Sequence, residues 1–145
     1  LITMSREIND FMAIHVVKHA MGMIGNIIRP KISILGIAYK ANVDDDRESL
    51  AFKIGRIAGN EGIEVVYHDP LMRDSEGNVV DLDKAVEGSD CLILVTDHDV
   101  FLDIDPNKLL VRHKNLIDTR NMLDHEEWRE AGFNVRVLGD GKTEN

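Results

Sequence analysis

Short apolar segments alternate with helical stretches over most of this chain, and no other feature restricts its possible folds so strongly. Five segments are rich in β-branched and other apolar residues, and they cover residues 32–37, 63–67, 91–95, 115–118 and 134–138. Each is nearly continuous in apolar character, which is typical of parallel strands covered by helices on both faces. Shorter helical patterns lie between them, including one over residues 49–62. We therefore expect an α/β fold with a doubly wound, mostly parallel sheet of five or six strands.

A long helix is predicted ahead of the first strand. Apolar residues recur at three-to-four spacing over residues 2–28, and Pro30 should end the helix because proline cannot continue the hydrogen-bond ladder. We expect residues 1–30 to form this helix and residues 31–145 to form the sheet domain. The chain begins inside the helical pattern without an initiator methionine, so we interpret it as part of a longer protein.

Charge and composition exclude several kinds of partner. The chain has 17 Lys and Arg against 26 Asp and Glu, a formal net charge of −9, which disfavours nucleic acid and anionic membranes. No apolar run approaches the roughly 20 residues that a membrane-spanning helix needs. The single cysteine, Cys91, cannot form an internal disulfide, which fits a reducing compartment. We expect a soluble, cytoplasmic protein.

The loop after the first strand is the first candidate binding segment, because ligands of doubly wound sheets bind beyond the carboxyl ends of strands. Only Gly36 of a G-x-G-x-x-G pattern is present, so the loop is not the usual dinucleotide cradle. Lys40 would supply a positive charge for a phosphate, although a solvated lysine is the alternative. For the following acidic turn, residues 44–46, helix capping is favoured over metal binding, and an internal ion pair is favoured for Arg47.

Arg120, two residues beyond the fourth predicted strand, is the second candidate. Its guanidinium could contact phosphate or sugar oxygens, or it could pair with Asp118 or Asp124. Residues 96–101 also follow a strand, and their aspartates and His98 fit loop capping better than a metal site. We expect Cys91 to be a small buried side chain and the remaining histidines to be structural, so no catalytic residue or metal ligand is predicted.

Several of these segments together carry a family resemblance. They are residues 34–40 (ILGIAYK), 43–49 (VDDDRES), 66–70 (VYHDP), 95–101 (VTDHDVF), 118–124 (DTRNMLD) and 132–135 (GFNV), preceded by 6–12 (REINDFM). In the sequence of these segments, the chain strongly resembles the carboxy-terminal domain of the UDP-glucose/UDP-N-acetylmannosamine/GDP-mannose dehydrogenase family. The resemblance covers essentially the whole chain.

The resemblance implies a Rossmann-like domain that closes over a nucleotide sugar. Tyr39 and Lys40 match the family's aromatic-lysine pair, whose lysine contacts the substrate, and Arg120 matches an arginine that reaches the same ligand. Arg47 matches an arginine near the NAD side of the cleft. The first helix is similar to one that contributes to dimers in the family.

The resemblance also implies a reaction for the complete enzyme. The family oxidises the sugar C6 alcohol to a carboxylate in two NAD-dependent steps through a cysteine-bound intermediate. The dinucleotide fold that binds most of NAD and the catalytic cysteine loop are absent from this sequence, so the chain alone should be inactive. The sequence of residues 43–49 is closer to the N-acetylmannosamine branch of the family than to the glucose branch. The choice between a UDP-sugar and a GDP-sugar stays open.

Two other functions compete with a UDP-sugar-binding part of a dehydrogenase. The chain could act mainly as an assembly module through its first helix, because an exposed apolar stripe attracts partners. A free-standing NAD-binding protein is disfavoured because Gly36 lacks its companion glycines.

Overall fold

Five parallel strands form one sheet in the order β2-β1-β3-β4-β5. The structure is a computed structural model that describes residues 2–37, 49–71 and 79–138, with the side chains of the first helix described from Asp10 onward. The strands are β1 (Lys31–Leu35), β2 (Glu64–His68), β3 (Cys91–Leu94), β4 (Asn115–Asp118) and β5 (Asn134–Val137). The predicted doubly wound parallel sheet is confirmed, with strand ends shifted by one or two residues.

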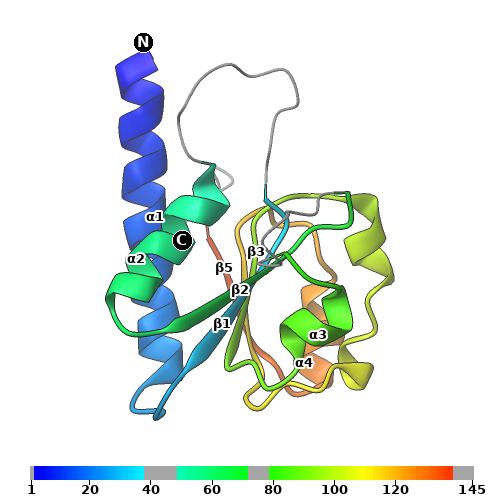
Figure 1. The fold of residues 1–145 in the computed structure, drawn as a ribbon. Helices are drawn as coiled ribbons and strands as arrows, with labels where there is room; N and C mark the ends of the chain where they lie inside the picture. The colour runs from blue at the N-terminus through cyan, green and yellow to red at the C-terminus, as the bar shows by residue number, and fades with distance from the viewer. Residues whose placement is uncertain (1, 38–48, 72–78, 139–145) are drawn as a thin grey trace.

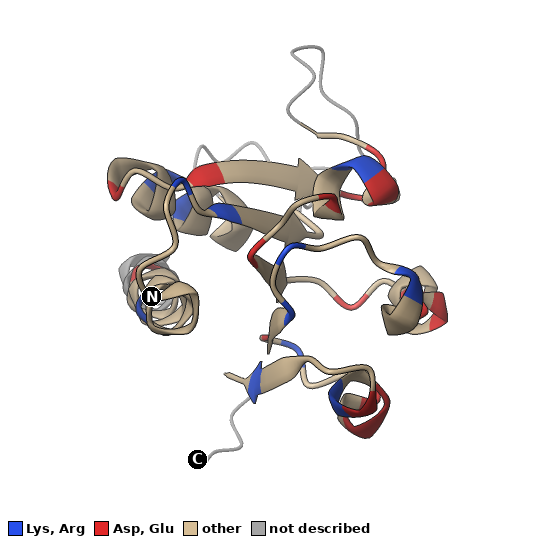
Figure 2. Ribbon diagram, turned by 90° about the horizontal axis from the view of Figure 1, so that it is seen from below, with Lys and Arg blue, Asp and Glu red and all other residues tan. Residues whose placement is uncertain are grey.

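Helices cover both faces of the sheet (Figures 1 and 2). The helices α1 (Ile2–Ile24) and α2 (Leu50–Asn60) pack on one face. The other face is covered by α3 (Leu82–Val86), α4 (His125–Glu130) and the 3-10 helix η1 (Asp99–Asp103), which is followed by η2 (Pro106–Lys108). Among the described residues, no helix combines the length and apolar character that crossing a membrane requires.

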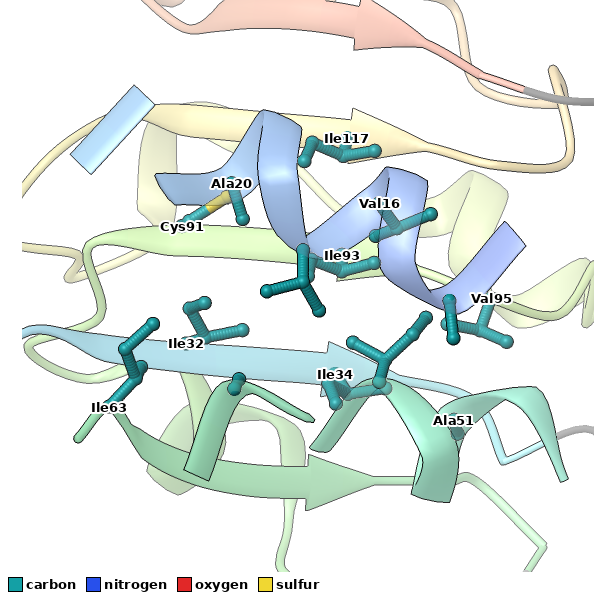
Figure 3. Close-up of a cluster of buried hydrophobic side chains, with 14 of the residues drawn as sticks. Val16, Ala20, Ile32, Ile34, Ala51, Ile63, Cys91, Ile93, Val95 and Ile117 are labelled. Atoms are coloured by element: carbon teal, nitrogen blue, oxygen red, sulfur yellow. The ribbon is translucent and has the colours of Figure 1, made fainter. Parts of the chain in front are cut away.

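Two buried clusters account for the continuous apolar strands. Along β1, Ile32 and Ile34 face α1 and α2, whereas Leu35 faces the opposite cluster. Figure 3 shows the first cluster, in which Val16 of α1 lies over Ile93 of β3. Successive side chains of a strand point to opposite faces, so both faces must be apolar when both are covered.

The first helix ends earlier than predicted. It stops at Ile24 rather than near residue 28, because Gly25 adopts a left-handed conformation with φ of 57°. The N–H of Gly25 still donates a hydrogen bond to the carbonyl of Met21 at 3.0 Å, as in helices that a C-terminal glycine caps. Pro30 therefore lies in the connection to β1 and does not itself end the helix.

A serine side chain caps the start of α2. Ser49 is the N-cap, and its hydroxyl accepts a hydrogen bond from the N–H of Phe52 at 3.3 Å. The aspartates at 44–46 lie outside the described residues. Within the first turn of α2, Lys53 is buried and pairs with Asp10 of α1 at 2.6 Å, which joins the two helices.

Candidate functional site

The order of the strands places a topological switch point between the carboxyl ends of β1 and β3. From these two central strands the sheet grows outward in opposite directions, through β2 on one side and through β4 and β5 on the other. At such a topological switch point the connecting segments diverge, and open α/β sheets bind their ligands there. The carboxyl end of β1 continues into Gly36, and that of β3 leads to Thr96.

Gly36 and Thr96 lie against each other at this switch point. Gly36 has φ of 91°, and a Cβ at that position would stand 1.9 Å from the hydroxyl oxygen of Thr96. Only glycine fits this conformation and this approach. Thr96 is 8% exposed, and its hydroxyl has no hydrogen-bond partner in the structure as described. A polar atom in this state is unusual in a folded protein and lies at the expected ligand edge.

Asp69 fixes the chain at Ile37, the last described residue after β1. Its buried carboxylate accepts hydrogen bonds from the N–H groups of Ile37 at 2.9 Å and Leu71 at 2.8 Å. His98 approaches the same carboxylate at 3.3 Å. Through Asp69, these contacts join Ile37 to the segment that follows β3.

Three of the predicted site residues fall between Ile37 and Ser49 in the sequence. Tyr39, Lys40 and Arg47 lie outside the described residues, so their placement stays a prediction. The described chain leaves β1 toward the switch point and returns at Ser49, the N-cap of α2.

Arg120 is placed at the carboxyl edge, as predicted from its position after β4. Its side chain is 50% exposed and lies 3.6 Å from the carboxylate of Asp97, which follows β3. The alternative of an ion pair with Asp118 or Asp124 is wrong. Asp118 binds the main chain instead, and Asp124 accepts a hydrogen bond from Glu127 as the N-cap of α4.

The carboxylate of Asp118 collects an unusual number of donors. Its buried oxygens accept hydrogen bonds from the main-chain N–H groups of four consecutive residues and from the Nε2 of His125 at 2.8 Å. The four residues are Arg120, Asn121, Met122 and Leu123. The turn after β4 is therefore organised around one side chain, which the sequence analysis did not single out.

In the segment at 96–101, His98 is a partner of Asp69. The predicted burial of Cys91 is confirmed. Burial raises the pKa of the Cys91 thiol to about 12. The thiol thus remains protonated at neutral pH and is a buried small side chain, not a nucleophile.

A second polar cluster, at the amino edge of the sheet, was not predicted. Asp90 is fully buried before β3 and binds Arg112 through both oxygens, at 2.7 and 2.6 Å, and His113 at 2.7 Å. The N–H of Lys31 donates to it at 2.8 Å. Burial raises the pKa of Asp90, but the hydrogen bonds from Arg112, His113 and Lys31 outweigh burial and leave it at about 2.

Comparison with known proteins gives consistent matches. Residues 33–125 match the model of the UDP-glucose/GDP-mannose dehydrogenase family, UDP binding domain. A UDP-N-acetyl-D-mannosamine dehydrogenase of Methanocaldococcus jannaschii is 40% identical over 98% of this chain and 34% of its own length. A UDP-glucose 6-dehydrogenase of Rickettsia conorii is 31% identical over 79% of this chain and 29% of its own length.

Solved structures give the same pattern. A UDP-N-acetylmannosamine dehydrogenase from Pyrococcus horikoshii has 33% identity and a TM-score of 0.69, over 92% of this chain and 31% of that one. The corresponding enzyme from Staphylococcus aureus has 28% identity and a TM-score of 0.71, over 92% of this chain and 32% of that one. The chain thus spans about a third of the length of the relatives that it matches.

Proposed function

The chain belongs to the UDP-glucose/GDP-mannose dehydrogenase family, and we propose that it is the nucleotide-sugar-binding part of an NAD-dependent nucleotide-sugar 6-dehydrogenase. Its substrate is UDP-N-acetylmannosamine or UDP-glucose, which the complete enzyme converts to the uronate. The similarity to N-acetylmannosamine dehydrogenases, at up to 40% identity, favours that sugar.

The observation that carries this proposal is the position of Arg120 beside the β1/β3 switch point. A guanidinium offers paired donors that match a phosphate, and half of its side chain is open to solvent. Because the chain has a formal net charge of −9, a diphosphate must be held by local positive charges and not by the overall field. We assign Lys40 as the second cation and Tyr39 as its aromatic neighbour in the same site.

NAD does not fit the residues of this chain as a main binding site. The turn after β1 contains Gly36 but no companion glycines, and Thr96 fills the space beside it. Close approach of a pyrophosphate needs the glycine-rich turn. We propose that other parts of the enzyme hold most of NAD, with Arg47 on the NAD side of the cleft, and that this chain alone does not oxidise sugars.

Ligand titration followed by NMR tests the proposed site. We expect UDP to bind weakly, with a dissociation constant on the order of 1 mM, because part of the cleft lies outside this chain. Lys40→Ala and Arg120→Ala should each weaken binding about tenfold by removing a charge-assisted hydrogen bond. NAD should bind more weakly than UDP, and GDP provides the comparison for base preference.

Matched controls are available away from the site. Lys108→Ala on η2 and Arg129→Ala near the end of α4 remove the same charges from exposed positions and should leave UDP binding unchanged. UDP binding that Lys40→Ala and Arg120→Ala both leave intact would exclude the proposed site. Preferential binding of NAD would favour a free-standing NAD-binding protein.

A second role, homodimerisation through α1, is supported by its exposed apolar side chains. Phe11, Ile14 and Met21 lie on the outer surface of this helix, and Phe11 is 72% exposed. Such a patch is typical of an interface. Light scattering should give a dimer mass that Phe11→Glu reduces to a monomer, while Lys108→Glu at an exposed position of η2 leaves it unchanged; a monomeric unaltered chain at high concentration would refute this role.

Location and the remaining partners complete the proposal. We propose that the protein works in the cytoplasm and binds neither nucleic acid nor membranes. The formal net charge of −9 opposes association with polyanionic surfaces, and Cys91 is a free buried thiol.

A further inference from the structure

We propose that Asp118, held by His125, is a positioning residue that sets Arg120 at the nucleotide-sugar site. This inference rests on the proposed function and extends it to two residues that do not themselves reach the ligand. Asp118 ends β4 at the carboxyl edge, and Arg120 follows two residues later.

The backbone of the turn is held by one carboxylate. Asp118 Oδ1 accepts the N–H groups of Arg120 at 2.9 Å and Asn121 at 2.8 Å, and Oδ2 accepts those of Met122 and Leu123 at 3.0 Å each. An ionised carboxylate has about four acceptor positions, so the main chain alone nearly saturates it. Asparagine would replace one accepting oxygen by an NH2 group and break the arrangement.

His125 completes this set of donors. Its Nε2 lies 2.8 Å from Oδ2 of Asp118, and its side chain is largely buried at the start of α4. A donor at this position adds a fifth contact to the same carboxylate and keeps it from turning toward solvent. The histidine thereby fixes the orientation of Asp118, and Asp118 fixes the turn.

The conformation of this turn determines where the guanidinium of Arg120 can reach. Asn121 takes a left-handed conformation with φ of 56°, so the main chain reverses directly after Arg120. Thr119 is tied to the end of β3 through its hydroxyl, which donates to the carbonyl of Leu94 at 2.7 Å. Within the described part of the chain, the side chain of Arg120 makes one ion pair, the 3.6 Å contact with Asp97. The main chain at Arg120 is thus held in place, while its guanidinium is accessible to solvent.

A double-mutant cycle separates positioning from simple stabilisation. UDP binding is measured by NMR titration for Asp118→Asn, His125→Leu and His125→Gln, each with Arg120 present and with Arg120→Ala, and melting temperatures are recorded in parallel. With Arg120 present, we expect Asp118→Asn to weaken binding about fivefold to tenfold and His125→Leu about threefold. His125→Gln should retain most of the affinity because glutamine still offers an N–H donor. With Arg120→Ala, the same substitutions should change affinity by less than about twofold.

The outcomes discriminate between the two proposals. Losses that are equal in both backgrounds, or unchanged affinity in Asp118→Asn and His125→Leu, would overturn the positioning role while leaving the proposed site intact. Absence of UDP binding to the unaltered chain, or no effect of Arg120→Ala, would overturn the proposed function and this inference together. If Asp118→Asn does not fold, the His125→Leu and His125→Gln pair decides the question. Asp105→Asn, which alters a carboxylate that caps η2, is the matched control.

Discussion

The two edges of the sheet each combine a buried aspartate with a nearby arginine, and they use the pair differently. At the amino edge, Asp90 binds the side chain of Arg112 directly through both oxygens. At the carboxyl edge, Asp118 binds His125 and the main chain, and the side chain of Arg120 stays half exposed. The first arrangement neutralises its arginine, whereas the second fixes the position of its arginine and leaves the charge available.

Under the proposed function, this difference distinguishes a structural arginine from a binding arginine. A guanidinium paired with a buried carboxylate cannot leave it without exposing an uncompensated charge to the protein interior. A guanidinium that is held only through its own backbone can exchange a weak surface contact for a ligand. The comparison predicts that substitutions at the amino edge alter stability, and that substitutions at the carboxyl edge alter binding.

Asp90→Ala should give the largest effect. We expect a loss of about 3 kcal/mol in the free energy of unfolding, because Arg112, His113 and the N–H of Lys31 all lose their acceptor. Urea denaturation measures this loss, and the folded protein should bind UDP with unchanged affinity. A loss of UDP affinity comparable with that of Arg120→Ala would break the comparison between the two edges.

Arg112→Ala should destabilise the protein less than Asp90→Ala, because the arginine side chain is 46% exposed and water can partly replace it. Arg120→Ala should change the free energy of unfolding by less than about 0.5 kcal/mol, as is usual for an exposed side chain. Denaturation and UDP titration on the same two variants should therefore give opposite results. Equal destabilisation by both would mean that Arg120 is also a structural residue.

The acid dependence of stability sharpens the same comparison. The net effect of its contacts lowers the folded-state pKa of Asp90 to about 2 from an ordinary value of 3.8. A lowered carboxyl pKa contributes stability above the unfolded value, and this contribution is lost as the pH falls from about 4 toward about 2. Urea denaturation over this range should show a decline that is shallower in Asp90→Asn. An unchanged slope would exclude Asp90 as a main source of the decline.

The smallest expected effect is at Asp97. This carboxylate lies 3.6 Å from Arg120 and competes with a phosphate for the guanidinium. An exposed ion pair contributes about 0.2–1 kcal/mol, so Asp97→Asn should tighten UDP binding about twofold to threefold. Asp103→Asn removes the same charge from the end of η1 and is the control. Weaker binding in Asp97→Asn would show instead that Asp97 orients the arginine.

The sheet was predictable because its physical signal is local and repeated. Strands covered on both faces must be apolar along their length, and the segments around Ile34 and Ile93 have this character. The end of α1 was predicted at Pro30 and not at Gly25, because a glycine inside a helical pattern ends the helix only if its surroundings favour the left-handed conformation. That choice depends on the chain beyond it.

The contacts of the site were less predictable, although Arg120 and its edge were expected. Asp118 acts through main-chain N–H groups, which every residue type except proline carries and which leave no mark in the sequence. The pairing of Arg120 with Asp97 depends on how β3 and β4 are aligned. The predicted roles of Tyr39, Lys40 and Arg47 remain predictions.

The ion pair between Lys53 and Asp10 has a consequence for where this polypeptide can be cut. The ammonium of Lys53 is almost completely enclosed, and its carboxylate partner belongs to α1. Removing the residues before Lys31 would leave the ammonium of Lys53 buried without its carboxylate partner. It would also expose to water the sides of Ile93 and Ile117 that α1 covers. The first helix is therefore an integral part of the sheet domain, and its removal should destabilise the domain.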